Sequence, residues 1–161
     1  MLTPVKNKSI RKANGLFAII ASRYNARYVD AMLRAAKTAL SKAGARTQII
    51  RVPGAYEIPV VAAKLASRSA EDGDLSAIIC LGVILRGETV HAAHIGEAVS
   101  DGLMKIQLSF GVPVVHEVLL LENEAQAKKR CLDPKHNRGT EAAQTALEMA
   151  HVMEGLSPHG E

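Results

Sequence analysis

The segment Arg86–His91 (RGETVH) holds residue types that could bind an anion and transfer a proton. Gly87 allows a sharp turn and a close approach of the backbone to a ligand. If a helix begins after it, the amides of Glu88 and Thr89 point out of the helix N-terminus, a ready site for an anion. His91 would then lie in the first turn, where the helix dipole favours a neutral imidazole that can accept a proton. A helix-start histidine that faces solvent explains the pattern equally well.

Two further segments carry residues that could contact a ligand. Tyr24 and Tyr56, two of only five aromatic residues in the chain, each follow an apolar run. Aromatic rings there could stack on a planar heterocycle, although a half-buried surface tyrosine explains either one alone. Glu57 would lie at the start of a helix. It could accept hydrogen bonds from substrate hydroxyls or serve only as a first-turn acid favoured by the helix dipole.

Basic residues surround a short loop near the C-terminus. Arg130, Lys135 and Arg138 flank or lie in residues 131–139. Guanidinium groups suit the forked recognition of phosphate, and a solvated basic loop is the alternative.

Two histidines and an acid recur at three-residue spacing. His91, His94 and Glu97 would share one helix face, which could suggest a metal site. A zinc site generally has three or four protein ligands in a tighter motif. We therefore predict that the protein binds no metal.

Apolar runs alternate along the chain with segments of helical period. Strands are predicted at Leu16–Ala21, Thr47–Val52, Leu75–Leu81 and Val112–Leu121. A loop is predicted at Gly82–Thr89. Helices are predicted at Tyr28–Ala43, Ile58–Ser69, Val90–Phe110, Glu124–Arg130 and Thr140–Met153. Gly44 would end the first helix, and Thr140 would be the N-cap of the last. This alternation predicts an α/β fold, a three-layer α/β/α sandwich with a four-stranded parallel sheet of the doubly wound, flavodoxin-like type. Its ligand would bind at the carboxyl ends of the strands.

Length and composition narrow the class further. The 161 residues suit one domain, with an extended segment at 1–14 and a frayed tail at 155–161. A net charge of +4 from scattered basic residues favours a small anionic substrate and no nucleic-acid partner. No apolar stretch approaches the roughly 20 residues of a membrane helix. Cys80 and Cys131 suggest no disulfide, and Met1–Asn14 has no signal-peptide core, so we expect a cytoplasmic protein without a membrane partner.

Six motifs, in this order and at this spacing, resemble those of the lumazine synthases. They are Arg23–Asn25 (RYN), Pro53–Pro59 (PGAYEIP), Gly82–His91 (GVILRGETVH), Gly111–Val115 (GVPVV), Glu124–Arg130 (EAQAKKR) and Asn137–Ala143 (NRGTEAA). Each is weak alone, but the set covers the chain from about Leu16 to Met153.

The resemblance implies a defined reaction. The family condenses 5-amino-6-(D-ribitylamino)uracil with 3,4-dihydroxy-2-butanone 4-phosphate. The product is 6,7-dimethyl-8-ribityllumazine, with release of phosphate and water, in the penultimate step of riboflavin biosynthesis. This transferase chemistry uses no metal or organic cofactor. Imine formation, phosphate elimination and ring closure depend on positioning and proton transfer.

The resemblance also implies roles for individual residues. His91 would be the general acid–base, and Arg130 would bind the phosphate in a neighbouring subunit's site. Substrate-binding roles would fall to Tyr24, Asn25, Ala55, Tyr56, Glu57, Val83, Ile84, Leu85, Gly87, Glu88, Thr89, His116 and Arg138. Tyr24 would stack on the pyrimidine, Glu57 would hold ribityl hydroxyls, and the strand-three residues would hold the uracil edge.

Several positions depart from the family pattern. Ala92, Ala93 and His94 follow His91, where the family commonly has an aromatic and an acidic residue. His116 and Glu117 stand in place of a Phe and a Gly. Glu88 replaces a small residue, and residues 133–136 (DPKH) replace a Gly-rich turn. These changes motivate an alternative function, a non-catalytic flavin- or lumazine-binding or shell-forming paralogue. A generic phosphate-binding flavodoxin-like protein is a third possibility.

The resemblance further implies a homo-pentamer whose active sites are shared between subunits. Some members of the family stack pentamers into decamers or 60-subunit shells, and riboflavin synthase is a further partner that the resemblance allows. The loop before Asn137 carries no insertion, which is compatible with a shell, while its altered composition argues against one. The sequence leaves the assembly open.

Overall fold

A computed structural model describes residues 13–158, and its core is a four-stranded parallel sheet. The strands are β1 (Leu16–Ser22), β2 (Arg46–Val52), β3 (Leu75–Leu85) and β4 (Val114–Leu121). They lie side by side in the order β2-β1-β3-β4. Because the chain turns to one side after β1 and then crosses to the other, the order reverses between β1 and β3. The predicted doubly wound parallel sheet is confirmed.

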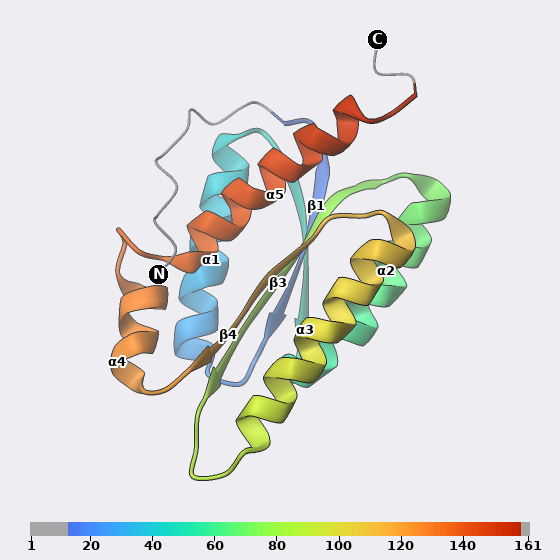
Figure 1. The fold of residues 1–161 in the computed structure, drawn as a ribbon. Helices are drawn as coiled ribbons and strands as arrows, with labels where there is room; N and C mark the ends of the chain where they lie inside the picture. The colour runs from blue at the N-terminus through green and yellow to red at the C-terminus, as the bar shows by residue number, and fades with distance from the viewer. Residues whose placement is uncertain (1–12, 159–161) are drawn as a thin grey trace.

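Helices cover both faces of this sheet. They are α1 (Ala26–Lys42), α2 (Ile58–Asp72), α3 (His91–Phe110), α4 (Glu124–Ala127) and α5 (Arg138–Gly155), with a short 3₁₀ turn η1 (Ala55–Glu57) and a π-helical turn η2 (Lys128–Leu132). α1 and α5 lie on one face, and α2 and α3 lie on the other (Figure 1). The predicted three-layer sandwich is therefore present.

The two central strands explain the long apolar runs of the sequence. Phe17, Ile19 and Ala21 of β1 pack against α1 and α5, whereas Ala18 and Ile20 pack against α2 and α3. β3 alternates in the same way. A strand covered on both faces needs apolar side chains at every position. The predicted burial of Cys80 is confirmed, since its thiol lies on β3 with no exposed surface.

Several predicted boundaries were wrong. α2 continues to Asp72 rather than ending at Ser69, and β4 begins at Val114 rather than at Val112. β3 continues through Gly82 to Leu85, where a loop was predicted, because Val83–Leu85 pair with Leu119–Leu121 of β4. α5 begins at Arg138, and its N-cap is Asn137 rather than Thr140, because Asn137 Oδ1 accepts a hydrogen bond from the Gly139 amide at 2.8 Å. The predicted helix Glu124–Arg130 is divided into α4 and the π-helical turn.

The two ends of the chain are only partly described. Residues 1–12 of the predicted extended segment and residues 159–161 of the predicted tail lie outside the described residues. Gly155, assigned to the tail, is the last residue of α5. Across residues 13–158, the structure contains no helix with the length and apolar character needed to span a membrane.

Gly139 lets the start of α5 lie directly on α1. A Cβ atom at this position would collide with the backbone carbonyl group of Met32. The two helices therefore approach at a point where one of them has no side chain.

We expect Gly139→Ala to lower the free energy of unfolding by about 1–3 kcal/mol, since backbone overlap outweighs the gain in helix propensity. The matched control is Gly155→Ala in the same helix, where an added Cβ meets nothing within 4 Å. Urea denaturation at one protein concentration would measure both. Equal stability of the two variants would contradict the close approach of α1 and α5.

Candidate functional site

A cavity of about 720 Å³ opens at the carboxyl ends of β2, β1 and β3. Its volume falls within the range of about 300–1,000 Å³ that is usual for small-molecule sites. It lies where the strand order reverses, the position at which such sheets bind ligands. The lining residues are Tyr24, Asn25, Gly54, Ala55, Tyr56, Glu57, Val83, Ile84, Leu85, His91, His94, Ile95 and Ala98.

One wall of the cavity is the end of β3, which extends past its neighbour β1. The last pair between the two strands is Ala21 with Leu81. Gly82–Leu85 continue beyond that pair and bond only to β4 on their other side. Backbone groups on the β1 side of this overhang therefore face the cavity rather than a strand.

Asn25 connects the loop after β1 to this overhang. Its side-chain amide donates to the Val83 carbonyl at 2.7 Å. Its backbone is left-handed, with φ 58° and ψ 40°, a conformation that Asn tolerates better than most residues. Asn25 is also the N-cap residue of α1. Asn25 thus bonds to the β3 overhang and also sets the direction of α1 relative to the site.

Two tyrosines stand at the rim of the cavity with most of their surface exposed. Tyr24 is 68% exposed and Tyr56 is 64% exposed, although both line the cavity. Gly54 makes room for the Tyr24 ring, since a Cβ at residue 54 would lie 2.7 Å from Tyr24 Cδ2. The rings are accessible to a planar ligand.

Glu57 lies at the start of α2, as predicted, and its side chain lines the cavity. It ends the 3₁₀ turn before α2, and its Oε2 accepts a hydrogen bond from the Gly54 amide at 2.9 Å. This contact holds the turn in shape. Among the described residues, Oε1 of the same carboxylate has no hydrogen-bond partner, and Glu57 lines the cavity.

Residues 86–90 form the connection between β3 and α3 and lie outside the set that lines the cavity. The guanidinium group of Arg86 pairs with Glu122 at 2.9 Å, and its amide donates to the Leu121 carbonyl at 2.8 Å. The Thr89 hydroxyl accepts a weak hydrogen bond from the His91 amide at 3.4 Å. Gly87 and Glu88 are exposed. α3 begins at His91 with Val90 as its N-cap, so the amides of Glu88 and Thr89 precede the helix rather than standing at its N-terminus as predicted.

His91 is the first residue of α3, as the sequence predicts, and it lines the cavity. His94 lines it as well, one turn further along the helix. Sequence analysis considered His94 as a possible metal ligand and as a departure from the family pattern, and it gave His94 no catalytic or substrate-binding role. The three-residue spacing from His91 is the signal that could have placed His94 at the cavity, because residues at i and i+3 share a helix face. Among residues 13–158, no group of three or more His, Cys, Asp or Glu side chains could hold a metal ion.

Three of the predicted site residues lie away from this cavity. Arg130, Arg138 and His116 are on η2, α5 and β4 and do not line it. β4 is at the edge of the sheet, so these residues belong to the far side of the molecule from β2. None of the residues that line the cavity with His91 comes from β4, η2 or α5.

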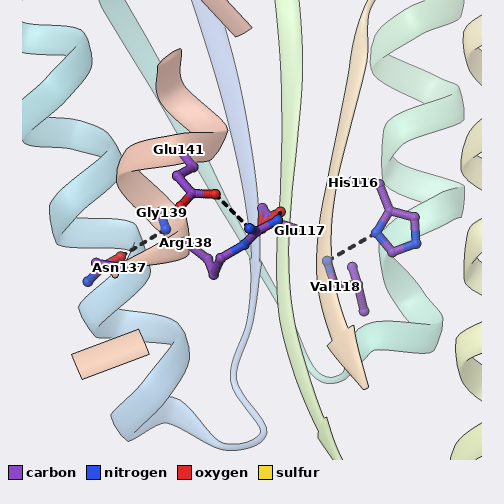
Figure 2. A network of polar contacts seen from close by, with 7 residues as sticks. All are labelled: His116, Glu117, Val118, Asn137, Arg138, Gly139 and Glu141. Carbon is purple, nitrogen blue, oxygen red and sulfur yellow. Dashed lines mark hydrogen bonds and ion pairs between the residues drawn. The ribbon is translucent and has the colours of Figure 1, made fainter. Parts of the chain in front are cut away.

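His116 is held by hydrogen bonds on the α3 side of β4. Its Nδ1 accepts from the Val118 amide at 3.2 Å (Figure 2), and its Nε2 lies 2.8 Å from Ser100 Oγ. The Ser100 hydroxyl donates to the Gly96 carbonyl at 2.8 Å, so Nε2–H must donate to Ser100. Burial lowers the pKa of His116, which favours this neutral form. Ser100 and His116 are therefore not arranged as nucleophile and base.

The neighbouring residue Glu117 points to the opposite face of β4 and binds Arg138 (Figure 2). The guanidinium group donates to both carboxylate oxygens, at 3.1 and 2.7 Å, and its third contact is with Glu141 at 2.6 Å. Burial raises the pKa of Glu117, and Arg138 opposes that shift. Arg130 also acts on the charge of Glu117, so both arginines lie near this carboxylate.

A parallel doubly wound sheet with a small-molecule cavity at its reversal point defines the chain as an α/β ligand-binding protein. The family model described as 6,7-dimethyl-8-ribityllumazine synthase matches residues 15–154. The chain belongs to this family.

Individual relatives agree with the family match. A 6,7-dimethyl-8-ribityllumazine synthase of Stenotrophomonas maltophilia (strain R551-3) is 43% identical over 143 residues, covering 87% of this chain and 90% of its own. That of Xanthomonas oryzae pv. oryzae (strain PXO99A) is 42% identical over 150 residues, covering 91% and 95%. A crystal structure of a sigma-54 interaction domain protein from Enterococcus faecalis aligns over 90% of this chain and 94% of that chain. Its TM-score of 0.31 and sequence identity of 11% do not indicate a shared fold or function.

We expect Arg138→Met to lower the free energy of unfolding by about 2–3 kcal/mol, since it leaves the buried Glu117 carboxylate with no ion-pair partner. The double variant Arg138→Met/Glu117→Met should recover most of that loss, because both polar partners are removed together. Urea denaturation would give the coupling energy. Arg86→Met is the control, since the Arg86–Glu122 pair is exposed and should be worth less than about 1 kcal/mol. No recovery in the double variant would contradict the pairing.

Proposed function

We propose that this protein catalyses the condensation of 5-amino-6-(D-ribitylamino)uracil with 3,4-dihydroxy-2-butanone 4-phosphate. The product is 6,7-dimethyl-8-ribityllumazine, with phosphate and water released. The observation that carries the proposal is a family match over residues 15–154, which includes every residue that lines the cavity. No observation favours the non-catalytic alternative. The enzyme is a transferase of riboflavin biosynthesis.

The cavity supports the binding of the ribitylaminouracil. Tyr24 is accessible for stacking on the pyrimidine. The overhanging end of β3, Val83–Leu85, offers backbone groups to the polar edge of the ring. Ala55 and Tyr56 line the same side as Glu57, whose Oε1 can accept a hydrogen bond from a ribityl hydroxyl. Asn25 frames this pocket through its bond to Val83.

The phosphate of the second substrate needs positive partners at the cavity mouth. The amides of Gly87, Glu88 and Thr89 lie next to His91 and could supply hydrogen-bond donors. The Glu88 side chain is exposed, which allows its carboxylate to point away while its amide binds. His91 lines the cavity at the first turn of α3 and would transfer protons during imine formation and ring closure.

The remaining residues would act on the site of a neighbouring subunit. Arg130 does not line the cavity of its own chain. We assign Arg130 to the phosphate bound in the site of the neighbouring subunit, with Arg138 as a second basic residue close to Arg130. His116 on β4 would border the neighbour's pyrimidine. A homo-oligomer, and a pentamer in particular, is therefore part of the proposal, and decamers or shells built from it are compatible.

Exposed apolar side chains support such an assembly. Met104 and Leu108, 52% and 75% exposed, lie one turn apart on α3, and Val60 on α2 is 70% exposed. Apolar surface of this kind is more stable when covered by a partner. We place the enzyme in the cytoplasm, where its buried cysteines would stay reduced.

We expect the purified protein to form 6,7-dimethyl-8-ribityllumazine from the two substrates, seen by absorbance and fluorescence. His91→Ala should lower kcat by about 10²–10⁴-fold, the usual contribution of a general acid–base. Arg130→Ala should raise KM for the butanone phosphate by about 10-fold or more, since it removes a charge-assisted hydrogen bond. Its KM for the uracil should change far less. Binding of lumazine or riboflavin without turnover by the wild type would contradict the proposal and favour the non-catalytic paralogue.

A mixed oligomer tests whether sites are shared. At a butanone phosphate concentration well below KM, His91→Ala and Arg130→Ala subunits should each have low activity alone. Random mixing by co-expression should restore about a quarter of the sites, one half for an intact His91 times one half for an intact neighbouring Arg130. Initial rates at equal total subunit concentration would measure the recovery. Mixed oligomers no more active than the average of the two parents would show that each site belongs to one chain.

A further inference from the structure

His94 is a second imidazole in the cavity, and it is free to react. Two other polar side chains of the cavity are used by the fold, since Asn25 bonds to Val83 and Glu57 Oε2 bonds to Gly54. Neither the His91 nor the His94 ring has a hydrogen bond or ion pair with another described residue. Imidazole is the side chain that gains or loses a proton between about pH 5 and 8. The cavity therefore contains two uncommitted proton-transfer groups.

The two rings lie on the same face of α3. Residues three apart on a helix have Cβ atoms about 5–6 Å apart. Ala92, between them in sequence, is turned into the core and is 7% exposed. The other α3 residues that line the cavity, Ile95 and Ala98, carry no polar atom in their side chains. A small polar group of a bound substrate could thus meet both imidazoles and no other polar side chain of this helix.

The condensation needs an acid and a base at the same step. Attack of the substrate amine on the ketone forms a carbinolamine with a new C–N bond. In the next step its C–O bond breaks, and the leaving oxygen takes a proton from an acid. The nitrogen lone pair forms the C=N bond while the N–H proton passes to a base. The products are the imine and water, and the acid and base have exchanged roles.

We infer that His94 is a second proton-transfer residue of this cavity, sharing one proton with His91 so that one ring acts as acid while the other acts as base. The inference rests on the proposed function, and it adds a residue to the reaction. It concerns a position at which this chain differs from the pattern described for its relatives.

The other ionisable residues that line the cavity with the two histidines are Glu57, Tyr24 and Tyr56. Glu97 follows His94 one turn along α3. From β4, His116 faces α3 further along and is bonded to Ser100. Glu57 is the one acidic residue among those that line the cavity.

The test is the pH profile of kcat/KM for the wild type, His94→Gln and His151→Gln. The wild type should give a bell with two limbs, which report the loss of the shared proton and the gain of a second one. His94→Gln should lose one limb and lower kcat by about 10–100-fold, with KM for both substrates little changed. His151→Gln, which removes an exposed imidazole on α5, should leave the rate and both limbs as in the wild type.

A second measurement does not depend on a folded variant. Diethyl pyrocarbonate modifies accessible imidazoles of the wild-type assembly, and peptide mass spectrometry reads each site. Saturation with 6,7-dimethyl-8-ribityllumazine should slow modification of His94 and leave that of His151 unchanged. Two limbs and a near-normal kcat in His94→Gln, or modification of His94 that the product does not slow, would overturn the inference while leaving the synthase function in place. A wild type that makes no lumazine would overturn the proposed function, and the inference with it.

Discussion

The unequal length of two paired strands creates the site. β1 stops pairing with β3 at Ala21 and Leu81, and β3 continues for four more residues. A central strand that loses one neighbour exposes backbone groups, which must find other partners. Asn25 supplies one by bonding to the Val83 carbonyl. The remaining space beside the overhang is the cavity, and the loops after β1 and β2 and the start of α3 close around it.

The same sheet separates two sets of predicted functional residues. The cavity lies at the ends of β2, β1 and β3, whereas Arg130, Arg138 and His116 lie by the edge strand β4. On β4, Glu117 faces α5 and His116 faces α3, since neighbouring residues of a strand point to opposite faces. Burial of the Glu117 charge raises the free energy of the folded state. Arg138 offsets that cost through a bidentate pair of hydrogen bonds, which also holds the start of α5 in place. Among the described residues Arg130, unlike Arg138, makes no ion pair, which agrees with the role that we propose for it in a neighbouring site.

Much of the fold followed from local pattern. Apolar runs predicted the four strands, and helical periodicity predicted α1, α2, α3 and α5, because these signals depend only on neighbouring residues. The end of β3 was misjudged, since Gly82 resembles a turn and only pairing with β4 keeps Val83–Leu85 extended. The α5 N-cap was misjudged for a similar reason. Thr140 and Asn137 are both good N-cap residues, and the hydrogen bonds that Asn137 also donates to the Cys131 and Ala31 carbonyls hold it at the N-cap position.

The sequence by itself determined the fold class, the family and the identities of the residues at the strand ends, because strand–helix alternation and six ordered motifs are local properties of the chain. The tertiary structure decided which of those residues meet. It brought the loops after β1 and β2 to the same cavity as His91 and His94, joined Asn25 to Val83 across 58 positions, and turned Arg138 onto Glu117. These contacts link distant segments, and their geometry depends on strand register and helix packing, which no local pattern specifies.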